Sequence, residues 1–147
     1  MPFKNNGVHV QEYVYDFAVD GGVKDVAIDL SAKKDFTTLP LNALVKGVTA
    51  IVLTSVTSGS SATVSWGDGV AADGYSGTTI AKATLVAGYV QNGWTGAGSL
   101  VWDNTNDVQL YPLVASSNKY LKLLISTADL TAGKIVFLVE YYMPSLP

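Results

Sequence analysis

Apolar residues recur with a period of two along several segments, which is typical of a β-strand with one buried face. Residues 9–17 place three aromatic side chains on one face: Tyr13, Tyr15 and Phe17. The opposite face of that segment is mixed: Val10, Glu12, Val14 and Asp16. Residues 23–30 alternate in the same way, and the Asp20-Gly21-Gly22 turn between the two segments predicts that they pair as a hairpin.

The longest predicted strand covers residues 45–57 and is β-branched almost throughout. It follows a loop at 39–43, where Pro40 prevents the continuation of a central strand. Ser58-Gly59-Ser60-Ser61 then turns the chain, and residues 62–66 return as a strand. These features predict a second hairpin.

The stretch 67–98 is rich in Gly, Ala, Asp and Thr and gives no clear period. Within it, residues 79–85 fit a short helix or an irregular strand, and both remain open. Residues 100–102 and 108–111 flank a predicted loop of Asx turns at 103–107. The last two predicted strands are 119–127 and 134–143, and four residues of the second share one face: Ile135, Phe137, Val139 and Tyr141.

About eight strands separated by turn signals predict an all-β fold, a jelly roll or β-sandwich of antiparallel strands. We expect one domain over 8–143, because 147 residues are the usual size of a single domain. The flanking segments are an N-terminal arm, 1–7, and a C-terminal tail, 144–147. Both are expected to be short, flexible and able to lie across a neighbouring molecule.

The charge composition favours a protein that contacts other proteins. Charged residues are 14% of the chain, against about 25% in typical soluble domains. A surface that is poor in charge and rich in Ser, Thr, Gly and Asn suits contact with neighbours. A Ser/Thr-rich face is also ordinary for a small all-β protein, so both interpretations stand.

Nucleic acid, membranes and thiol chemistry fit the composition poorly. The net charge is −3, and all nine basic residues are lysines, so there is no guanidinium for phosphate recognition. No apolar run approaches the roughly 18 residues of a membrane helix, and no signal-peptide pattern is present. With no cysteine, there is no disulfide or thiolate site. We therefore expect a soluble protein made in the cytoplasm.

The sequence shows no pattern that is typical of an enzyme. His9 is the single histidine, and no Gly-x-Ser-x-Gly motif presents a serine nucleophile, so an exposed histidine at a strand end is expected. Glu12 and Glu140 are the two glutamates, and nothing in the sequence places them together for glycosidase chemistry. We expect no catalytic residue and no cofactor.

Three features could bind a ligand or a partner. The 103–107 segment is a weak calcium candidate through four oxygen-rich side chains, although Asx turns explain it equally well: Asp103, Asn104, Asn106 and Asp107. Trp66 and Trp102 are expected in the core. Trp94 lies in a Gly-rich loop, where it could anchor a partner, stack on a sugar or fold back over the core. The other candidate partner-binding residues begin the arm: Met1, Pro2, Phe3 and Lys4.

Three segments together resemble a group of small virion proteins of tailed phages: Tyr15-Asp16-Phe17-Ala18-Val19-Asp20-Gly21-Gly22, Leu39-Pro40-Leu41-Asn42-Ala43-Leu44-Val45 and Ser60-Ser61-Ala62-Thr63-Val64-Ser65-Trp66-Gly67. This group is similar to capsid decoration or cement proteins. The resemblance covers roughly residues 13 to 67, its motifs are structural, and it assigns no binding residue.

The resemblance implies a jelly roll that sits as a homo-oligomer, a dimer or trimer, on the outer surface of a phage capsid. Its partner would be the major capsid protein, and its role would be to stabilise the head. The alternative is a carbohydrate-binding jelly roll for attachment to the host surface. That alternative predicts a sugar site around Trp94 and the 103–107 loop.

Overall fold

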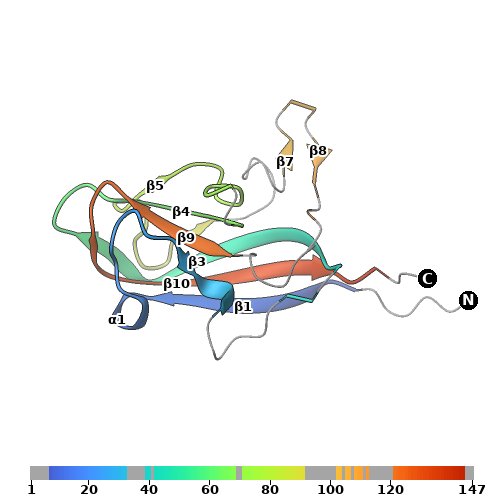
Figure 1. Cartoon of the computed structure of the whole chain (residues 1–147), viewed down its shortest axis with the longest axis horizontal. Helices are drawn as coiled ribbons and strands as arrows, with labels where there is room; N and C mark the ends of the chain where they lie inside the picture. Colours follow the sequence, from blue (N-terminus) through green and yellow to red (C-terminus); the bar gives the residue numbers. More distant parts are fainter. Residues whose placement is uncertain are drawn as a thin grey trace, which may run out of the picture.

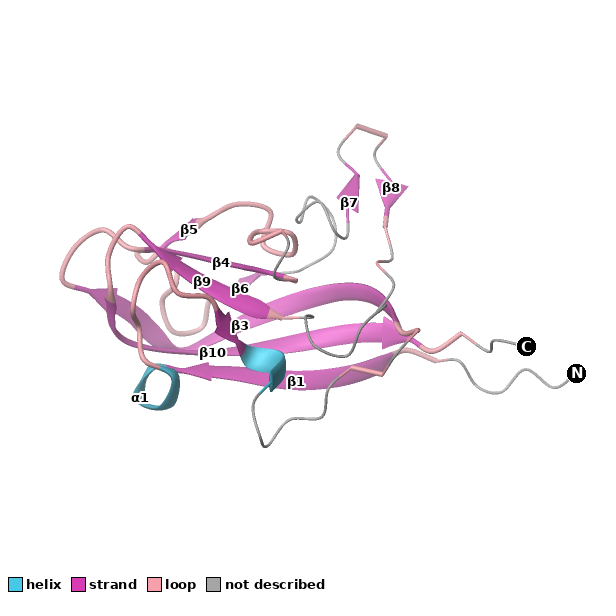
Figure 2. Cartoon of the chain, in the orientation of Figure 1, coloured by secondary structure: helices cyan, strands magenta, loops and turns pink. Residues whose placement is uncertain are grey.

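The structure is a computed structural model, and it describes residues 7–32, 39–40, 42–68, 71–91, 102–103, 105–106, 108–110, 112 and 121–144. Within these residues the chain forms ten β-strands and very little helix (Figure 1). Eight of the strands build two four-stranded antiparallel sheets, which stack as the two layers of a sandwich (Figure 2). The prediction of an all-β sandwich is confirmed.

Sheet A contains the long strands, and its order is β1-β10-β3-β6. Its members are β1 (His9–Asp16), β10 (Leu130–Tyr142), β3 (Leu44–Ser58) and β6 (Val90–Gln91). The β-branched and aromatic residues of these segments fit a pleated surface well, which accounts for the length of β3 and β10. The predicted strands at 9–17, 45–57 and 134–143 therefore lie in one sheet.

Sheet B contains shorter strands in the order β2-β9-β4-β5. Its members are β2 (Ile28–Asp29), β9 (Lys122–Ser126), β4 (Thr63–Gly67) and β5 (Ile80–Ala81). A third sheet is the two-stranded pair of β7 (Trp102–Asp103) and β8 (Val108–Gln109). In the view of Figure 1 this pair stands apart from the sandwich.

The strand order is that of a jelly roll. The first strand pairs with the last, β1 with β10, and the second with the second-last, β2 with β9. Inside this outer wrap, β3 pairs with β6 and β4 pairs with β5. Nested pairing that alternates between two sheets is the wrapped Greek-key topology of the double-sheet jelly roll.

The predicted hairpin of 9–17 with 23–30 is wrong, because its two strands lie in different sheets. After β1 the chain forms one helical turn, α1 (Phe17–Asp20), whose N-cap Asp16 accepts a hydrogen bond from the Ala18 amide at 3.0 Å. Gly22 then packs against β10, where its carbonyl accepts from the Leu130 amide at 2.8 Å. A Cβ at Gly22 would lie 2.8 Å from the Leu130 Cβ, so Gly22 permits a close approach, whereas Gly21 caps the helical turn at φ 74°.

The predicted hairpin of 45–57 with 62–66 is also wrong. The turn at 58–61 carries the chain from sheet A to sheet B, so β3 pairs with β10 and β6 while β4 pairs with β9 and β5. The pairing of β4 with β9 extends over five residue pairs, from Thr63 opposite Ser126 to Gly67 opposite Lys122. The residues at 58–61 do reverse the chain, as predicted, but the strand after the turn lies in the other sheet.

The open alternatives for 79–85 resolve as a short strand followed by a turn. Ile80 and Ala81 form β5, and residues 82–84 turn away from it. The segment 103–107, predicted as a loop, contributes Asp103 to β7, and Thr105 and Asn106 form the turn. The connection from β9 to β10 is shorter than predicted, because β10 begins at Leu130 and passes through several β-bulges before the regular pairing that starts at Ile135.

The core fills the space between the two sheets. Its largest fully buried side chains are Trp66, Tyr13, Tyr15 and Phe137. Trp66 from sheet B meets Phe137 from sheet A edge-on, with ring centroids 5.2 Å apart and planes at 67°. Such edge-to-face contacts add roughly 0.5–1.5 kcal/mol to the burial of the rings, and this one joins the two layers.

Candidate interaction surface

All of the residues singled out in the sequence as partner-binding candidates lie outside the described residues. They are Met1, Pro2, Phe3, Lys4 and Trp94. The described chain begins at Gly7, and β1 starts at His9, which lies opposite Tyr141 near the end of β10. The first strand of sheet A therefore begins beside the end of its last strand, and the roles of the arm and the tail remain predictions.

The structure describes only two of the four residues of the calcium candidate. Asn104 and Asp107 lie outside the described residues, Asp103 belongs to β7, and Asn106 is exposed in the turn. Among the residues that the structure describes, no three His, Cys, Asp or Glu side chains are grouped to hold a metal ion. No helix in the described part of the chain is long and apolar enough to cross a membrane.

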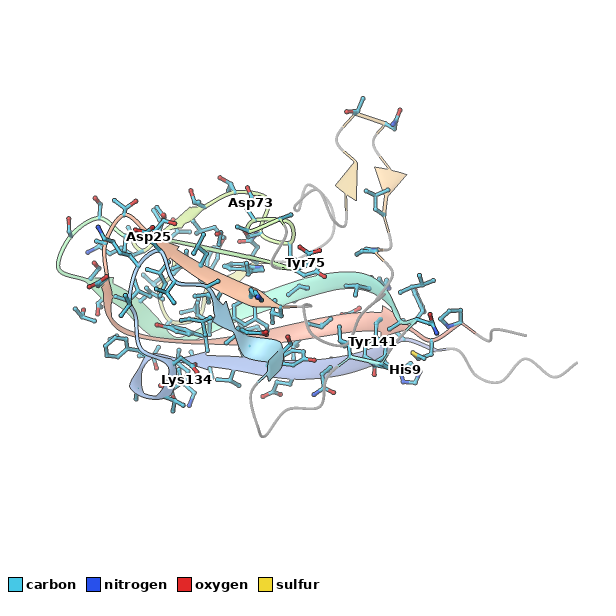
Figure 3. All side chains as sticks on the ribbon, in the orientation of Figure 1. His9, Asp25, Asp73, Tyr75, Lys134 and Tyr141 are labelled. Carbon is cyan, nitrogen blue, oxygen red and sulfur yellow. The ribbon has the colours of Figure 1, made fainter. Side chains whose placement is uncertain are left out.

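The structure places three other residues of interest. Trp66 is fully buried, as predicted. The backbone of Trp102 lies in β7. His9 is exposed at the first position of β1, as predicted, and its ring stacks on Tyr141 at 5.3 Å between centroids (Figure 3).

The most unusual surface is the outer face of sheet A, the side that points away from sheet B. One register row crosses all four strands on this face and is aliphatic in every strand: Val14 in β1, Val136 in β10, Ile51 in β3 and Val90 in β6. Further apolar side chains extend the row: Val10, Leu138 and Leu53. Val10, Leu53 and Val90 are the most open, at 56%, 53% and 55% exposure. We call this set the aliphatic face.

The outer face of sheet B has a different character. Its outward positions are mostly polar or small: Asp29, Lys122, Ser126, Thr63, Ser65, Gly67 and Ala81. Leu124 is the large apolar exception. An antiparallel sheet with one face in water normally alternates apolar inward and polar outward. Sheet B follows that rule at Asp29, Lys122 and Thr63, although Ser65 and Gly67 are buried, and sheet A does not follow it.

Charged groups border the aliphatic face at both ends. At one end Asp16 pairs with Lys134, with the carboxylate and ammonium 3.4 Å apart. Toward the other end lie Glu12, opposite Leu138, and Glu140, opposite Val10. Their positions make them diagonal neighbours on adjacent strands, which brings Cα atoms to about 7–8 Å. The structure shows no ion pair for either glutamate among the described residues, and the nearby Lys46 has its ammonium 5.7 Å from the centroid of the Tyr142 ring.

The end of β1 near the Asp16–Lys134 pair is held by two hydrogen bonds. Asp20 accepts from the Asp16 amide at 2.8 Å, and the hydroxyl of Tyr15 donates to the Gly21 carbonyl at 2.8 Å. Burial, with the nearby carboxylates of Asp20 and Asp16 adding to it, raises the pKa of Tyr15 to about 12. The neutral phenol therefore holds the loop after α1 against the sheet at all ordinary pH values.

Sequence reasoning missed the aliphatic face, although part of its signal was present. Ile135 to Val139 is an unbroken run of five apolar residues, a pattern expected of a strand covered on both faces. The alternation predicts that Ile135, Phe137 and Val139 share one face, and it gives no role to Val136 and Leu138 on the other. The mixed face of residues 10–16 was noted, but its pairing with β10 was not foreseen.

Comparison with known proteins gives a match at the level of structure. No protein-family model matches the sequence, and no curated protein is detectably similar to it. A chain of the cyanophage Pam1 capsid asymmetric unit superposes with a TM-score of 0.60 over 98% of this chain and 91% of that chain, at 22% identity. A chain of the acidic stable capsid structure of Helicobacter pylori bacteriophage KHP30 covers 94% and 89%, with a TM-score of 0.44 and 18% identity. The Pam1 chain shares the fold of this protein over nearly its full length.

Proposed function

We propose that this chain is a structural protein of a tailed-phage virion, which binds the outer surface of the capsid as a homo-oligomer and stabilises the head. The observation that carries the proposal is the near full-length jelly-roll likeness to a chain of the Pam1 capsid asymmetric unit. The resemblance of residues 15–22, 39–45 and 60–67 to phage decoration proteins supports the same role.

The physical character of the molecule suits that role. A sandwich wrapped by nested strand pairs is rigid, and the edges of sheet B are two-residue strands that offer little template for stray pairing. Many copies on a symmetric shell make weak individual contacts sufficient, because binding through linked sites is multiplied. A role of this kind requires a surface complementary to the shell and requires no catalytic group.

Two measurements test the proposal on the purified full-length chain. Its mass in solution gives the oligomeric state, and sedimentation with shells of the encoding phage prepared without the protein gives binding. We expect a homo-oligomer that co-sediments at a fixed ratio to the shell subunit and delays DNA release when the heads are heated. A chain that stays in the supernatant and leaves the release temperature unchanged would refute the role.

The glycan-binding alternative stays a prediction. It depends on Trp94 and on the 103–107 segment, of which the structure describes the strand position of Asp103 and the turn at Thr105 and Asn106. A chain that ignored the shells would make a glycan-array screen, with Trp94→Ala as the comparison variant, the next measurement.

A further inference from the structure

The geometry points to the aliphatic face of sheet A as the surface that docks on the capsid shell, against an apolar ridge that carries a lysine or arginine beside it. This inference rests on the proposed function and deepens it, because it says which face meets the shell and what chemistry the partner presents.

The first argument is that no described part of the chain covers the aliphatic face. Val14, Val136, Ile51 and Val90 form one row across the whole sheet, and no described element of this chain packs over it. Apolar surface gains about 25 cal/mol for each Å² removed from water. Exposed contiguous apolar patches on soluble proteins commonly mark interaction sites. The outward positions of sheet B are mostly polar or small, so an aliphatic row that crosses every strand is particular to sheet A.

The second argument is charge complementarity. Lys134 is held by Asp16 at 3.4 Å, and Lys46 lies beside the Tyr142 ring, its ammonium 5.7 Å from the centroid. Glu12 and Glu140 project from the same face with no ion pair among the described residues. A partner that covers the aliphatic row would desolvate these carboxylates, which is costly unless a cation meets them. A lysine or arginine of the partner at that position satisfies the requirement.

A second copy of this chain fits the face less well. Two facing copies with the same ends together would bring four carboxylates into a like-charge contact. In the opposite orientation the glutamates would meet the Asp16–Lys134 end, where the lysine is already paired with Asp16. The face is also small: three strands about 4.8 Å apart over eight residues of about 3.3 Å each, with the two residues of β6 beside them, give roughly 400 Å². Stable pairwise interfaces bury about 800 Å² on each partner. A contact of this size suits a shell, where many copies bind at once.

The first test removes the exposed apolar side chains without touching the core. The variant is Val10→Asn with Val90→Asn, whose side chains are 56% and 55% exposed on the aliphatic face. The matched control is Val23→Asn with Val26→Asn, 60% and 56% exposed in the loop before β2. We expect the first double variant to bind shells about tenfold more weakly, from two half-exposed valines that lose their burial. The control should bind like the wild type, and thermal unfolding checks that both fold.

The second test addresses the carboxylates. Binding of the wild type should weaken when salt rises from about 0.1 M to about 1 M, since the Debye length falls from about 10 Å to about 3 Å. Glu12→Gln with Glu140→Gln should bind more weakly at low salt and lose this additional salt dependence. A variant whose salt curve coincides with that of the wild type would overturn the charged part of the contact.

The outcomes separate this inference from the function on which it rests. If the wild type does not bind shells, the proposed function fails. If the wild type binds and the two valine double variants bind equally well, the role stands and the assignment of the face is wrong. If Val10→Asn with Val90→Asn instead dissociates the oligomer in solution, the face joins copies of this chain, and the shell assignment is likewise overturned.

Discussion

The phenol of Tyr15 connects the C-terminal end of β1 to the loop that follows α1. Removing its hydroxyl should change the free energy of unfolding by an amount that depends on pH. The side chain is fully buried, and its hydroxyl donates to the Gly21 carbonyl at 2.8 Å. Tyr15→Phe keeps the ring and removes the donor, so the Gly21 carbonyl loses its partner. Deleting one such hydrogen bond costs about 1–2 kcal/mol of the free energy of unfolding, and this is the expected loss at pH 8.

The ionisation of Tyr15 gives the second half of the prediction. Its pKa is raised to about 12 in the folded protein, against about 10 in the unfolded chain. The folded state therefore binds the phenolic proton more tightly, and the stability from this group is fully present below pH 10. It is lost as the pH rises from 10 through 12, and linkage gives a loss of about 1.4 kcal/mol at pH 11.

Urea or guanidinium unfolding of both proteins at pH 8 and pH 11 is the assay. Lysines and other tyrosines titrate in both proteins and cancel in the difference, so the change isolates Tyr15. We expect the wild type to exceed Tyr15→Phe by about 1–2 kcal/mol at pH 8 and the gap to close by about 1.4 kcal/mol at pH 11. A gap that stays constant across this range would show that the phenol is not the buried, carboxylate-flanked group described here.

Two further predictions concern the backbone. Gly67→Ala would place its Cβ 1.7 Å from the Ala71 carbonyl oxygen, so the backbone must move, and we expect a loss of at least about 2 kcal/mol in thermal or chemical unfolding. Gly59→Ala is its control, with no heavy atom within 4 Å, and an equal loss in both would contradict the steric reasoning. Thr127 is an exposed β-branched residue at φ 77°, and Thr127→Asn should raise the melting temperature through a gain of about 1 kcal/mol, because Asn tolerates this region. A drop would show that contacts of the threonine outweigh its strain.

Local patterns predicted the strands well because the period of two is a property of neighbouring residues. Tyr13 and Tyr15 are buried on one face of β1, and Ile135, Phe137 and Val139 are buried on one face of β10, as the alternation indicated. Trp66 also lies in the core, as its apolar strand context indicated. These features depend on the burial of one face and need no knowledge of the partner strand.

Strand partners were not predictable in the same way. The turn signals at 20–22 and 58–61 suggested local hairpins, whereas β1 pairs with β10, more than a hundred residues away. In this jelly roll the connections after β1, β2 and β3 each cross between the sheets, so a turn there does not imply pairing of its two flanks. The aliphatic face has the same origin: Val14, Ile51, Val90 and Val136 come from four distant segments, and the register alone assembles them.

A cryo-electron microscopy difference map of phage shells with and without the purified chain tests the central claim most directly. We predict added density at symmetry-related positions on the outer surface, fitted by the sandwich with sheet A facing the shell and Glu12 and Glu140 beside a basic side chain. Shells that gain no density after incubation with excess protein would contradict the account.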